Sequence, residues 1–264
     1  MTFRRFSWRA AILAATLLCA VRTAWGYLLD WDSVSWTPGS LTNSYDIDAS
    51  NPGNDITIAF SGDTWALENY WGEDSPFITT TNQGGYQNES ALMFAMDYTA
   101  KYQGITVTVT FNYSNGVYLD NFQLFDIDRG SSSGSGQYYW TDWIKNIWGT
   151  TTNGTIVAPT LTNLGPYVTT IGTGTNRSLV GTATANNTSA QGNATIIFNQ
   201  VGIKSFQYTY TTYSNSQSNP SEQHVQLYDF SYRPVPEMGV AWAPLGIFAV
   251  GFLVRQMRRR RASA

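Results

Sequence analysis

The segment Ile105–Phe111 restricts the fold more than any other part of this 264-residue chain. Its four apolar residues alternate with three threonines, and a period of two places the two kinds on opposite faces of a strand. One face of this strand is therefore expected to be buried and the other to meet water. Asn115-Gly116 follows, before the run Val117–Asp128, and this dipeptide between two such runs predicts a β-hairpin.

Other parts of the chain have the same strand-forming composition and are separated by clusters of Gly, Asn, Ser and Pro. These further candidate strands are Asp55–Phe60, Ala91–Tyr98, Ala194–Phe198, Ser205–Tyr213 and His224–Tyr232. Seven or more strands without a long helical period between the two ends predict an all-β fold, either an antiparallel β-sandwich or a jelly roll. Trp31 and Trp36 are expected in its core. The polar stretch 146–191 predicts either two weak strands with wide loops or a surface insertion.

The first 26 residues have the features of a secretory signal peptide. Three arginines precede the apolar segment Ala10–Val21, and Ala24 and Gly26 place small residues at the two positions that signal peptidase reads. We therefore expect cleavage between Gly26 and Tyr27. The alternative is an uncleaved N-terminal anchor.

The last part of the chain differs sharply from the rest. Pro236-Glu237 precedes the apolar run 239–254, and the basic residues Arg258, Arg259, Arg260 and Arg261 lie close to the end. The arginines are expected to keep that end cytoplasmic. A helix over this run would span about 24 Å, which is short for the ~30 Å hydrocarbon core of a bilayer. This predicts a transmembrane segment that stops in the membrane temporarily.

This order of parts resembles the PEP-CTERM sorting signal of Gram-negative bacteria, which exosortase enzymes process. Pro236 and Glu237 match the family's Pro-Glu-Pro pattern, and Met238 stands at the position of its last proline. The resemblance covers residues 234–264 and implies that an exosortase-like enzyme cuts near Pro236-Glu237. The alternative is a single-pass tail that stays in the membrane. The expected organisation is thus a signal peptide (1–26), a β-sandwich ectodomain (27–233) and a sorting tail (234–264).

The charge of the chain is divided between its middle and its ends. Nine of the 15 basic residues lie outside 27–238, so six basic residues face 18 acidic ones there and the net charge is −12. Such a domain is repelled by phosphate backbones, and we expect no nucleic-acid partner. The one cysteine, Cys19, lies in the predicted signal peptide. The mature domain therefore has no disulfide and depends on its core.

Three aspartates form the first candidate site. Asp126 and Asp128 end the run that starts at Val117, and Asp142 follows a Gly-Ser loop, 130–136. Alternation predicts that Asp126 and Asp128 point the same way, roughly 7 Å apart. Such carboxylates suit Ca²⁺, which takes six to eight oxygen ligands; the alternative is that they cap a turn through the backbone. Phe-x-x-Phe-Asp-x-Asp also resembles a recurrent strand of secreted bacterial β-sandwich domains.

Aromatic residues form the second candidate site. Exposed rings of this kind stack on the apolar faces of sugars, and the alternative is that they fill the core. The late cluster, which we expect to bind a ligand, is Tyr138, Tyr139, Trp140 and Trp143, followed by Trp148, and an earlier cluster is Trp65, Tyr70 and Trp71.

Templates for catalysis find little support, and we expect no catalytic residue and no enzyme. His224 is the one histidine, and it lies at a strand start with no Gly-x-Ser-x-Gly motif nearby. A glycosidase needs only two carboxylates at a set separation. The acids that remain for this role are Glu68, Glu73, Glu89 and Glu222, of which the first two flank Tyr70-Trp71.

We expect an exported protein of the cell envelope or extracellular matrix, anchored in the membrane transiently, with a structural or binding role. Its expected partners are signal peptidase and the sorting enzyme. The alternative function is a carbohydrate-binding module that takes a polysaccharide, with or without Ca²⁺. A glycoside hydrolase or lyase ranks last.

Overall fold

The computed structural model describes residues 26–79 and 82–236, of which Gly26–Val235 form one compact unit. The predicted signal peptide, apart from Gly26, lies outside these residues, as does the predicted tail from Glu237 onward. Pro236 is described, and Tyr27 begins the first strand. In the described part of the chain, no helix has the length and apolar character needed to cross a membrane.

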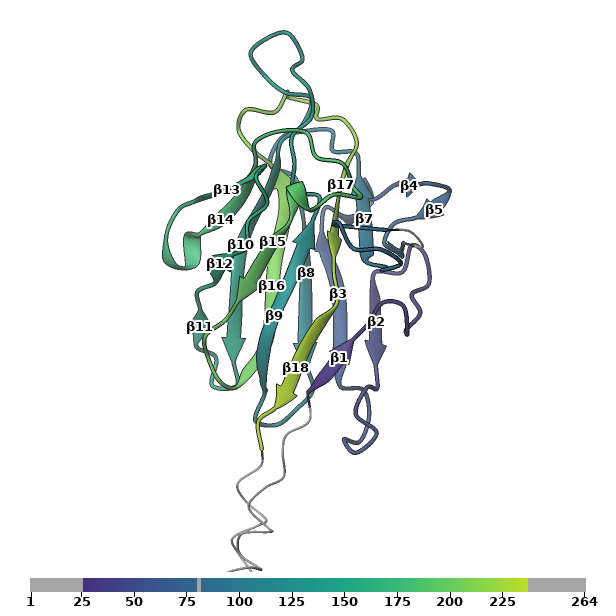
Figure 1. Ribbon diagram of the computed structural model, residues 1–264, viewed down its shortest axis with the longest axis vertical. Coiled ribbons are helices and arrows are strands. Elements are labelled where there is room, and N and C mark those ends of the chain that lie inside the picture. The colour runs from purple at the N-terminus through teal and green to yellow at the C-terminus, as the bar shows by residue number, and fades with distance from the viewer. Residues whose placement is uncertain (1–25, 80–81, 237–264) are drawn as a thin grey trace, which may run out of the picture. The chain divides into compact units, whose positions relative to one another are not determined.

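The described residues form an all-β fold, as predicted, with three short 3₁₀ helices (Figure 1). The strands are β1 (Tyr27–Leu29), β2 (Thr42–Tyr45), β3 (Ile56–Gly62), β4 (Asn69–Tyr70), β5 (Glu73–Asp74), β6 (Phe77–Ile78), β7 (Leu92–Met96), β8 (Gly104–Phe111), β9 (Val117–Phe125), β10 (Asp142–Thr151), β11 (Ile156–Val157), β12 (Thr160–Thr162), β13 (Val168–Ile171), β14 (Ser178–Gly181), β15 (Ala194–Ile197), β16 (Ile203–Thr212), β17 (Gln223–Leu227) and β18 (Phe230–Pro234). The 3₁₀ helices are η1 (Thr64–Ala66), η2 (Gly174–Asn176) and η3 (Ala190–Gly192).

One antiparallel sheet of 16 strands makes up the body, and β4 and β5 form a separate pair. In one half of the sheet the strands run in the order β13, β14, β10, β16, β8, β3 and β2. In the other half β9 pairs with β15 on one side and with β17 and β18, one after the other, on the other side. A single residue pair, Ile203 with Val117, joins β16 to β9.

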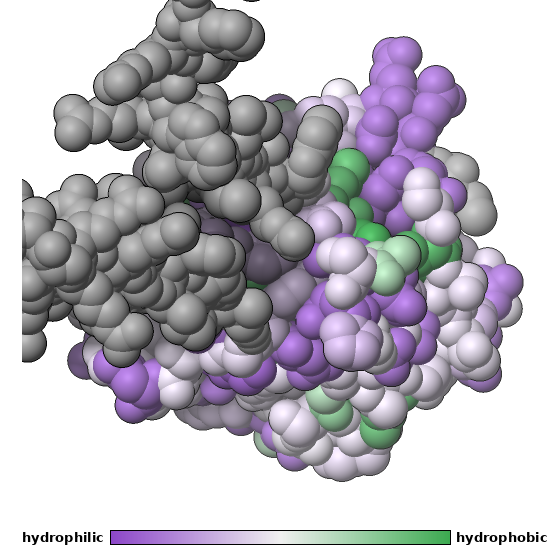
Figure 2. All heavy atoms as spheres, turned by 90° about the horizontal axis from the view of Figure 1, so that it is seen from below, coloured by the Kyte–Doolittle hydropathy of each residue, from purple (hydrophilic) through white to green (hydrophobic). Residues whose placement is uncertain are grey.

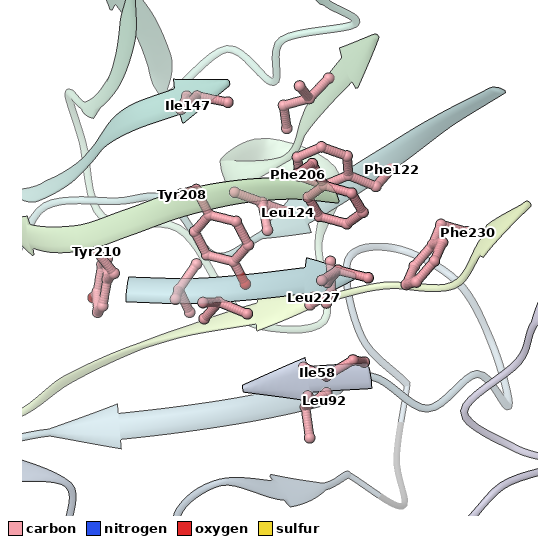
Figure 3. Close-up of a cluster of buried hydrophobic side chains, with 14 of the residues drawn as sticks. Ile58, Leu92, Phe122, Leu124, Ile147, Phe206, Tyr208, Tyr210, Leu227 and Phe230 are labelled. Carbon is pink, nitrogen blue, oxygen red and sulfur yellow. The ribbon is translucent and has the colours of Figure 1, made fainter. Parts of the chain in front are cut away.

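Rings from the two halves pack against each other, so the curled sheet encloses one core in the manner of a sandwich. Phe122 of β9 stacks on Phe206 of β16 with ring centroids 4.2 Å apart (Figure 3). Phe94 of β7 meets Tyr210 of β16 edge to face at 5.8 Å. Trp31 is also in this core, as predicted, and so is Trp36. Figure 2, seen from below, shows a largely hydrophilic described surface with small separate hydrophobic patches.

The candidate strands predicted from the sequence are present, except that His224–Tyr232 is divided into β17 and β18 at Tyr228 and Asp229. The alternation in β8 is confirmed by its burial pattern. The predicted hairpin at Asn115-Gly116 is wrong. Strand β8 pairs with β3 and β16, whereas β9 pairs with β15, β16, β17 and β18. The turn exists, with a bond from the Gly116 N–H to the Tyr113 carbonyl. The turn therefore connects the two halves of the sheet.

Strand β10 was not predicted, and it replaces the polar insertion at the start of the 146–191 stretch. Its alternation breaks in the middle: Ile144 and Ile147 are both fully buried although three positions separate them. The ladder with β16 shifts register between Lys145 and Trp148, and Asn146 has a φ of +53°. A β-bulge inserts one residue in this way, and it hides a strand from any search for a period of two.

Phe122→Ala tests the packing between the two halves. Phe122 is fully buried, and loss of such a ring leaves a cavity, so we expect the free energy of unfolding to fall by about 3–5 kcal/mol. Urea denaturation followed by tryptophan fluorescence measures this. The control is Tyr118→Ala on the same strand, where the ring is 37% exposed, and a loss below about 1 kcal/mol is expected. Equal losses in the two variants would contradict the cross-sheet stack.

Candidate functional site

The three predicted aspartates lie together at one end of the molecule, with Asp126 and Asp128 in the turn after β9 and Asp142 as the first residue of β10. Strand β9 ends at Phe125, and Asp126 then adopts a left-handed backbone with a φ of +63°. Aspartate tolerates this conformation better than most residues. Asp126, Asp128 and Asp142 are all buried, the last one completely. The predicted pair at a strand end is thus replaced by a turn that directs the carboxylates inward.

Asp128 and Asp142 are saturated by internal hydrogen bonds. Asp142 accepts from the Tyr210 hydroxyl at 2.6 Å and from the Asp128 N–H at 2.9 Å. Asp128 accepts from the Trp140 indole N–H at 3.1 Å and from the Ala185 N–H at 2.9 Å. Each bond uses a different carboxylate oxygen. These two aspartates therefore connect the loops around them.

Burial changes the protonation of both groups. It raises the pKa of Asp142 well above its usual range, and the nearby Asp128 carboxylate adds to the effect. Burial, together with Asp126, raises the pKa of Asp128 to about 6. Within residues 26–79 and 82–236, no three His, Cys, Asp or Glu side chains are grouped so that they could hold a metal ion. Calcium at Asp126, Asp128 and Asp142 stays a prediction.

Asp126 is the member of the trio that still has free bonding capacity. Its Oδ2 lies 2.7 Å from Nε2 of His224, and Asn187 Nδ2 lies 2.9 Å from the same ring nitrogen. Its Oδ1 is buried and has no hydrogen-bond partner among the described residues. A buried carboxylate oxygen without a donor is costly. Asp126 therefore has one oxygen without a donor among the described residues, and burial keeps that oxygen away from solvent.

Three rings lie side by side next to Asp126, and we call Tyr70, Trp71 and His224 the ring platform. The ring centroid of Tyr70 is 4.8 Å from that of His224 and 5.0 Å from that of Trp71. Trp71 and His224 are 6.4 Å apart. Trp71 is 56% exposed, so the platform combines an open indole surface with partly buried neighbours.

A short hairpin carries Tyr70 and Trp71, two of the three rings of the platform. Strands β4 and β5 pair through Tyr70 and Glu73, and the two residues between them, Trp71 and Gly72, have φ values of +53° and +87°. Two positive φ values are typical of a type I′ turn, which usually has Asn-Gly or Asp-Gly. Figure 1 shows this hairpin projecting from the body beside β7. Trp is unusual at the first position of such a turn, and this residue is the feature of the sequence that indicates the hairpin.

The late aromatic cluster is less open than predicted. Trp140 is half-buried, bonded to Asp128, and its ring covers Gly130 closely. Tyr138 lies under the guanidinium of Arg129 at 3.8 Å. Tyr139 is 40% exposed. The structure therefore leaves less free ring surface here than at Trp71.

The other predicted aromatics lie on strands or on η1. Trp143 and Trp148 are half-buried on β10, and Trp143 meets Tyr213 edge to face at 5.6 Å. Trp65, on η1, is 59% exposed. These positions place the early cluster, not the late one, at the most accessible surface.

The candidate catalytic acids lie in three different places. Glu68 lies close enough to Glu222 and Asp97 for their charges to act on it, and burial with these charges raises its pKa to about 7. Glu73 is exposed on β5. Glu89 accepts from the Tyr228 hydroxyl at 3.0 Å, and both line a cavity of about 670 Å³.

That cavity is strongly acidic. Besides Glu89, its walls include Asp30, Asp32 and Asp229, and no basic residue lines it within the described chain. Burial and these neighbouring carboxylates raise the pKa of Asp229 to about 7. The negative charge of the domain is thus also found in the lining of this cavity.

His224 is the residue that sequence reasoning missed. It was considered as a member of a catalytic triad and rejected, yet it joins the platform to Asp126. Its place on β17 was readable in part, because Val225 and Leu227 are buried in the core while His224 alternates to the other face. Its contacts with Tyr70 and Asn187 connect distant parts of the chain and left no local signal.

The sequence matches no protein-family model and no curated protein. Two solved structures show a weak likeness. One is TmCBM61 in complex with β-1,4-galactotriose, at 14% identity over 67% of this chain and 88% of that chain, with a TM-score of 0.30. The other is a family 11 carbohydrate-binding module from Clostridium thermocellum in complex with a β-1,3-1,4-mixed-linked tetrasaccharide, at 8% identity over 80% and 97%, with a TM-score of 0.28. Likenesses at this level identify neither a family nor a ligand for this chain.

Glu68→Gln tests the electrostatics of the site through pH dependence. A carboxyl whose pKa is raised on folding stabilises the native state at low pH, and this contribution is lost as pH rises from its unfolded value near 4.5 to about 7. We therefore expect Tm to fall between pH 5 and pH 8 in the wild type and to fall less in the variant. Differential scanning calorimetry measures both. A decline of the same size in the two proteins would contradict the raised pKa.

Proposed function

We propose that this domain binds carbohydrate at the ring platform and does not cleave it. The observation that carries the proposal is the exposed indole of Trp71, held next to the rings of Tyr70 and His224. Sugars have apolar faces made of C–H groups and polar edges made of hydroxyls. An open aromatic surface with a polar side chain such as Asn187 beside it matches both.

The polar border of the platform supports orientation of a bound sugar. Asn187 carries both a donor and an acceptor and lies 2.9 Å from His224. The Tyr70 ring is half-buried, and its packing against His224 limits the positions that either ring can take. Groups that are fixed before binding lose little freedom on binding, which favours affinity.

A binding role fits the carboxylates better than a catalytic one. Glycoside cleavage needs one carboxylic acid that donates a proton and one free carboxylate on the other side of the bond. Asp128 and Asp142 have both of their oxygens in internal hydrogen bonds. Burial and neighbouring carboxylates raise the pKa values of both groups, which needs no catalytic explanation.

Trp71→Asn tests the platform. Asparagine keeps the left-handed backbone of this position but removes the indole, so we expect Kd for a bound polysaccharide to rise at least tenfold, which corresponds to about 1.4 kcal/mol. Isothermal titration calorimetry against β-glucan, galactan, mannan and xylan, each with and without a chelator, measures the effect and also tests the predicted calcium.

The control for this test is Tyr118→Ala. Tyr118 is exposed near the start of β9, whereas the platform lies beyond the end of that strand, so its loss is expected to leave Kd unchanged. If no glycan gives heat with the wild type, the proposed function is wrong. If Trp71→Asn binds as tightly as the wild type, the site is wrongly placed.

We also propose that the protein is exported and processed at its sorting tail. The support is the sequence alone: a signal-like start, an acidic middle, and Pro236-Glu237 before an apolar run and the four arginines. In this role the ectodomain holds polysaccharide at the cell surface or in the extracellular matrix, and the sorting enzyme releases or re-anchors it.

Expression in hosts with and without an exosortase tests the sorting proposal. We expect intact mass spectrometry to show a mature protein that begins at Tyr27 and lacks the residues beyond the Pro236-Glu237 region when the enzyme is present. A host without the enzyme should retain the tail. A variant with Pro236→Ala and Glu237→Ala is expected to keep the tail in both hosts. Retention of the tail by the wild type in the exosortase host contradicts the proposal.

A further inference from the structure

We propose that Trp65 and Tyr102 extend the ring platform into an elongated binding surface, so that the domain binds a stretch of a long polysaccharide chain and binds short oligosaccharides weakly. This inference rests on the proposed carbohydrate function and deepens it by naming the size of the ligand. Three observations carry it: the exposure of these rings, the contacts that hold them near the platform, and the backbone conformation of Tyr102.

Three aromatic side chains are much more exposed than the others in the described part of the chain. Trp65, Trp71 and Tyr102 are 59%, 56% and 54% exposed, and the next ring, that of Tyr139, is 40% exposed. A ring left in water forgoes the free energy that its burial would gain, and it offers a sugar an open surface with a polar end. All three rings are therefore accessible to a ligand without any movement of the chain.

Trp65, on η1, lies beside the loop that carries Tyr102. Its indole N–H donates to Oδ1 of Asp63 at 3.4 Å, and Oδ2 of the same carboxylate accepts from the Gly104 N–H at 2.8 Å. The Asp63 N–H also donates to the Gly104 carbonyl at 3.0 Å. Because Tyr102 is two residues before Gly104, one aspartate holds the segments of both rings next to each other.

Backbone contacts place Trp65 near the platform. The carbonyl of Ala66, the residue after Trp65, accepts from the Asp97 N–H at 3.0 Å. Two residues before Asp97, Ala95 of β7 lies opposite His224 of the platform. Two residues of a strand cover about 7 Å, so the segment of Trp65 and the platform are separated by roughly that distance along β7. A ligand that contacts both is therefore longer than a single sugar.

The backbone of Tyr102 has the same unusual conformation as that of Trp71. Six described residues other than glycine have a positive φ, and four of them are Asn or Asp, which tolerate it. The other two are Trp71, at +53°, and Tyr102, at +68°. Bulky side chains rarely adopt this conformation, and such strain is found mainly at functional sites. The two strained aromatic residues are thus also two of the three most exposed rings.

The polar groups near these rings favour a polysaccharide over a protein partner. Asp63 is half-buried and Asp97 is exposed, and both contact the segment of Trp65. The centre of a protein interface is depleted of charged residues. Sugars carry hydroxyl donors between their apolar faces, and carboxylates accept bonds from such donors. Separate rings with carboxylates near them therefore fit a chain of sugars.

The dependence of binding on ligand length tests this inference. The probes are trisaccharides and octasaccharides with the linkages of β-glucan, galactan, mannan and xylan. Titration of the full chain, followed by calorimetry for strong binding and by NMR for weak binding, gives Kd for each probe. We expect the octasaccharide to bind the wild type at least tenfold more tightly than the trisaccharide of the same linkage.

Trp65→Ala and Tyr102→Asn are the principal variants, because both remove exposed rings and asparagine tolerates the left-handed backbone. Combined, they are expected to weaken binding of the octasaccharide at least fivefold and to leave Kd for the trisaccharide, which occupies the platform, unchanged. Trp65→Phe keeps a ring and should retain most of the length dependence. The control is Tyr118→Ala, which removes an exposed ring near the start of β9 and should alter neither Kd.

The outcomes separate this inference from the proposed function. If the trisaccharide and the octasaccharide bind the wild type equally well, the elongated surface is wrong although the platform still binds sugar. If the length dependence survives in the combined variant, or Tyr118→Ala reduces it as much, Trp65 and Tyr102 do not form the surface and the inference is overturned. If no glycan of either length binds, the proposed function fails and this inference falls with it.

Discussion

The fully buried carboxyl group of Asp142 holds the strands and turns at this end of the molecule together. A carboxylate without water is tolerated only when donors replace the lost hydration, and here the donors come from two distant places. Tyr210 on β16 supplies its hydroxyl, and the backbone after β9 supplies the Asp128 N–H. The same hydroxyl lies 3.0 Å from the carbonyl of His224. One buried group therefore ties β10, β16 and the β9 turn together, and it sets the position of the strand that carries His224.

The other residues of the site are connected to Asp142 in turn, from the core to the surface. Asp128 is held by the same turn and receives Trp140 and Ala185, which closes two loops over the aspartates. Asp126 is turned the other way by its left-handed backbone and meets His224. His224 in turn supports Tyr70 and Trp71. Asp128 and Asp142 thus use both of their carboxylate oxygens in internal hydrogen bonds, whereas Oδ1 of Asp126 has no partner among the described residues.

Prediction from the sequence succeeded where the physics is local. The alternation in Ile105–Phe111 identified a strand with one buried face, and the aspartates and the early aromatic cluster were recognised as unusual groups. It failed where the outcome depends on distant partners. The bulge at Asn146 concealed β10, and the turn at Asn115-Gly116 has the residues of a hairpin although the strands on either side of it pair with other strands. The role of His224 depends on contacts with Asp126, Asn187 and Tyr70, which no spacing along the chain reveals.

The hairpin that carries Trp71 consists of only two pairs of residues, and it stands apart from the 16-stranded sheet. Its residues contribute little to the core, so exchanges at its tip cost the fold almost nothing. Asp142 and its partners, by contrast, cannot change without loosening several strands at once. A change of residue at the tip of the hairpin therefore alters the exposed surface at Trp71 while the frame around Asp142 stays the same.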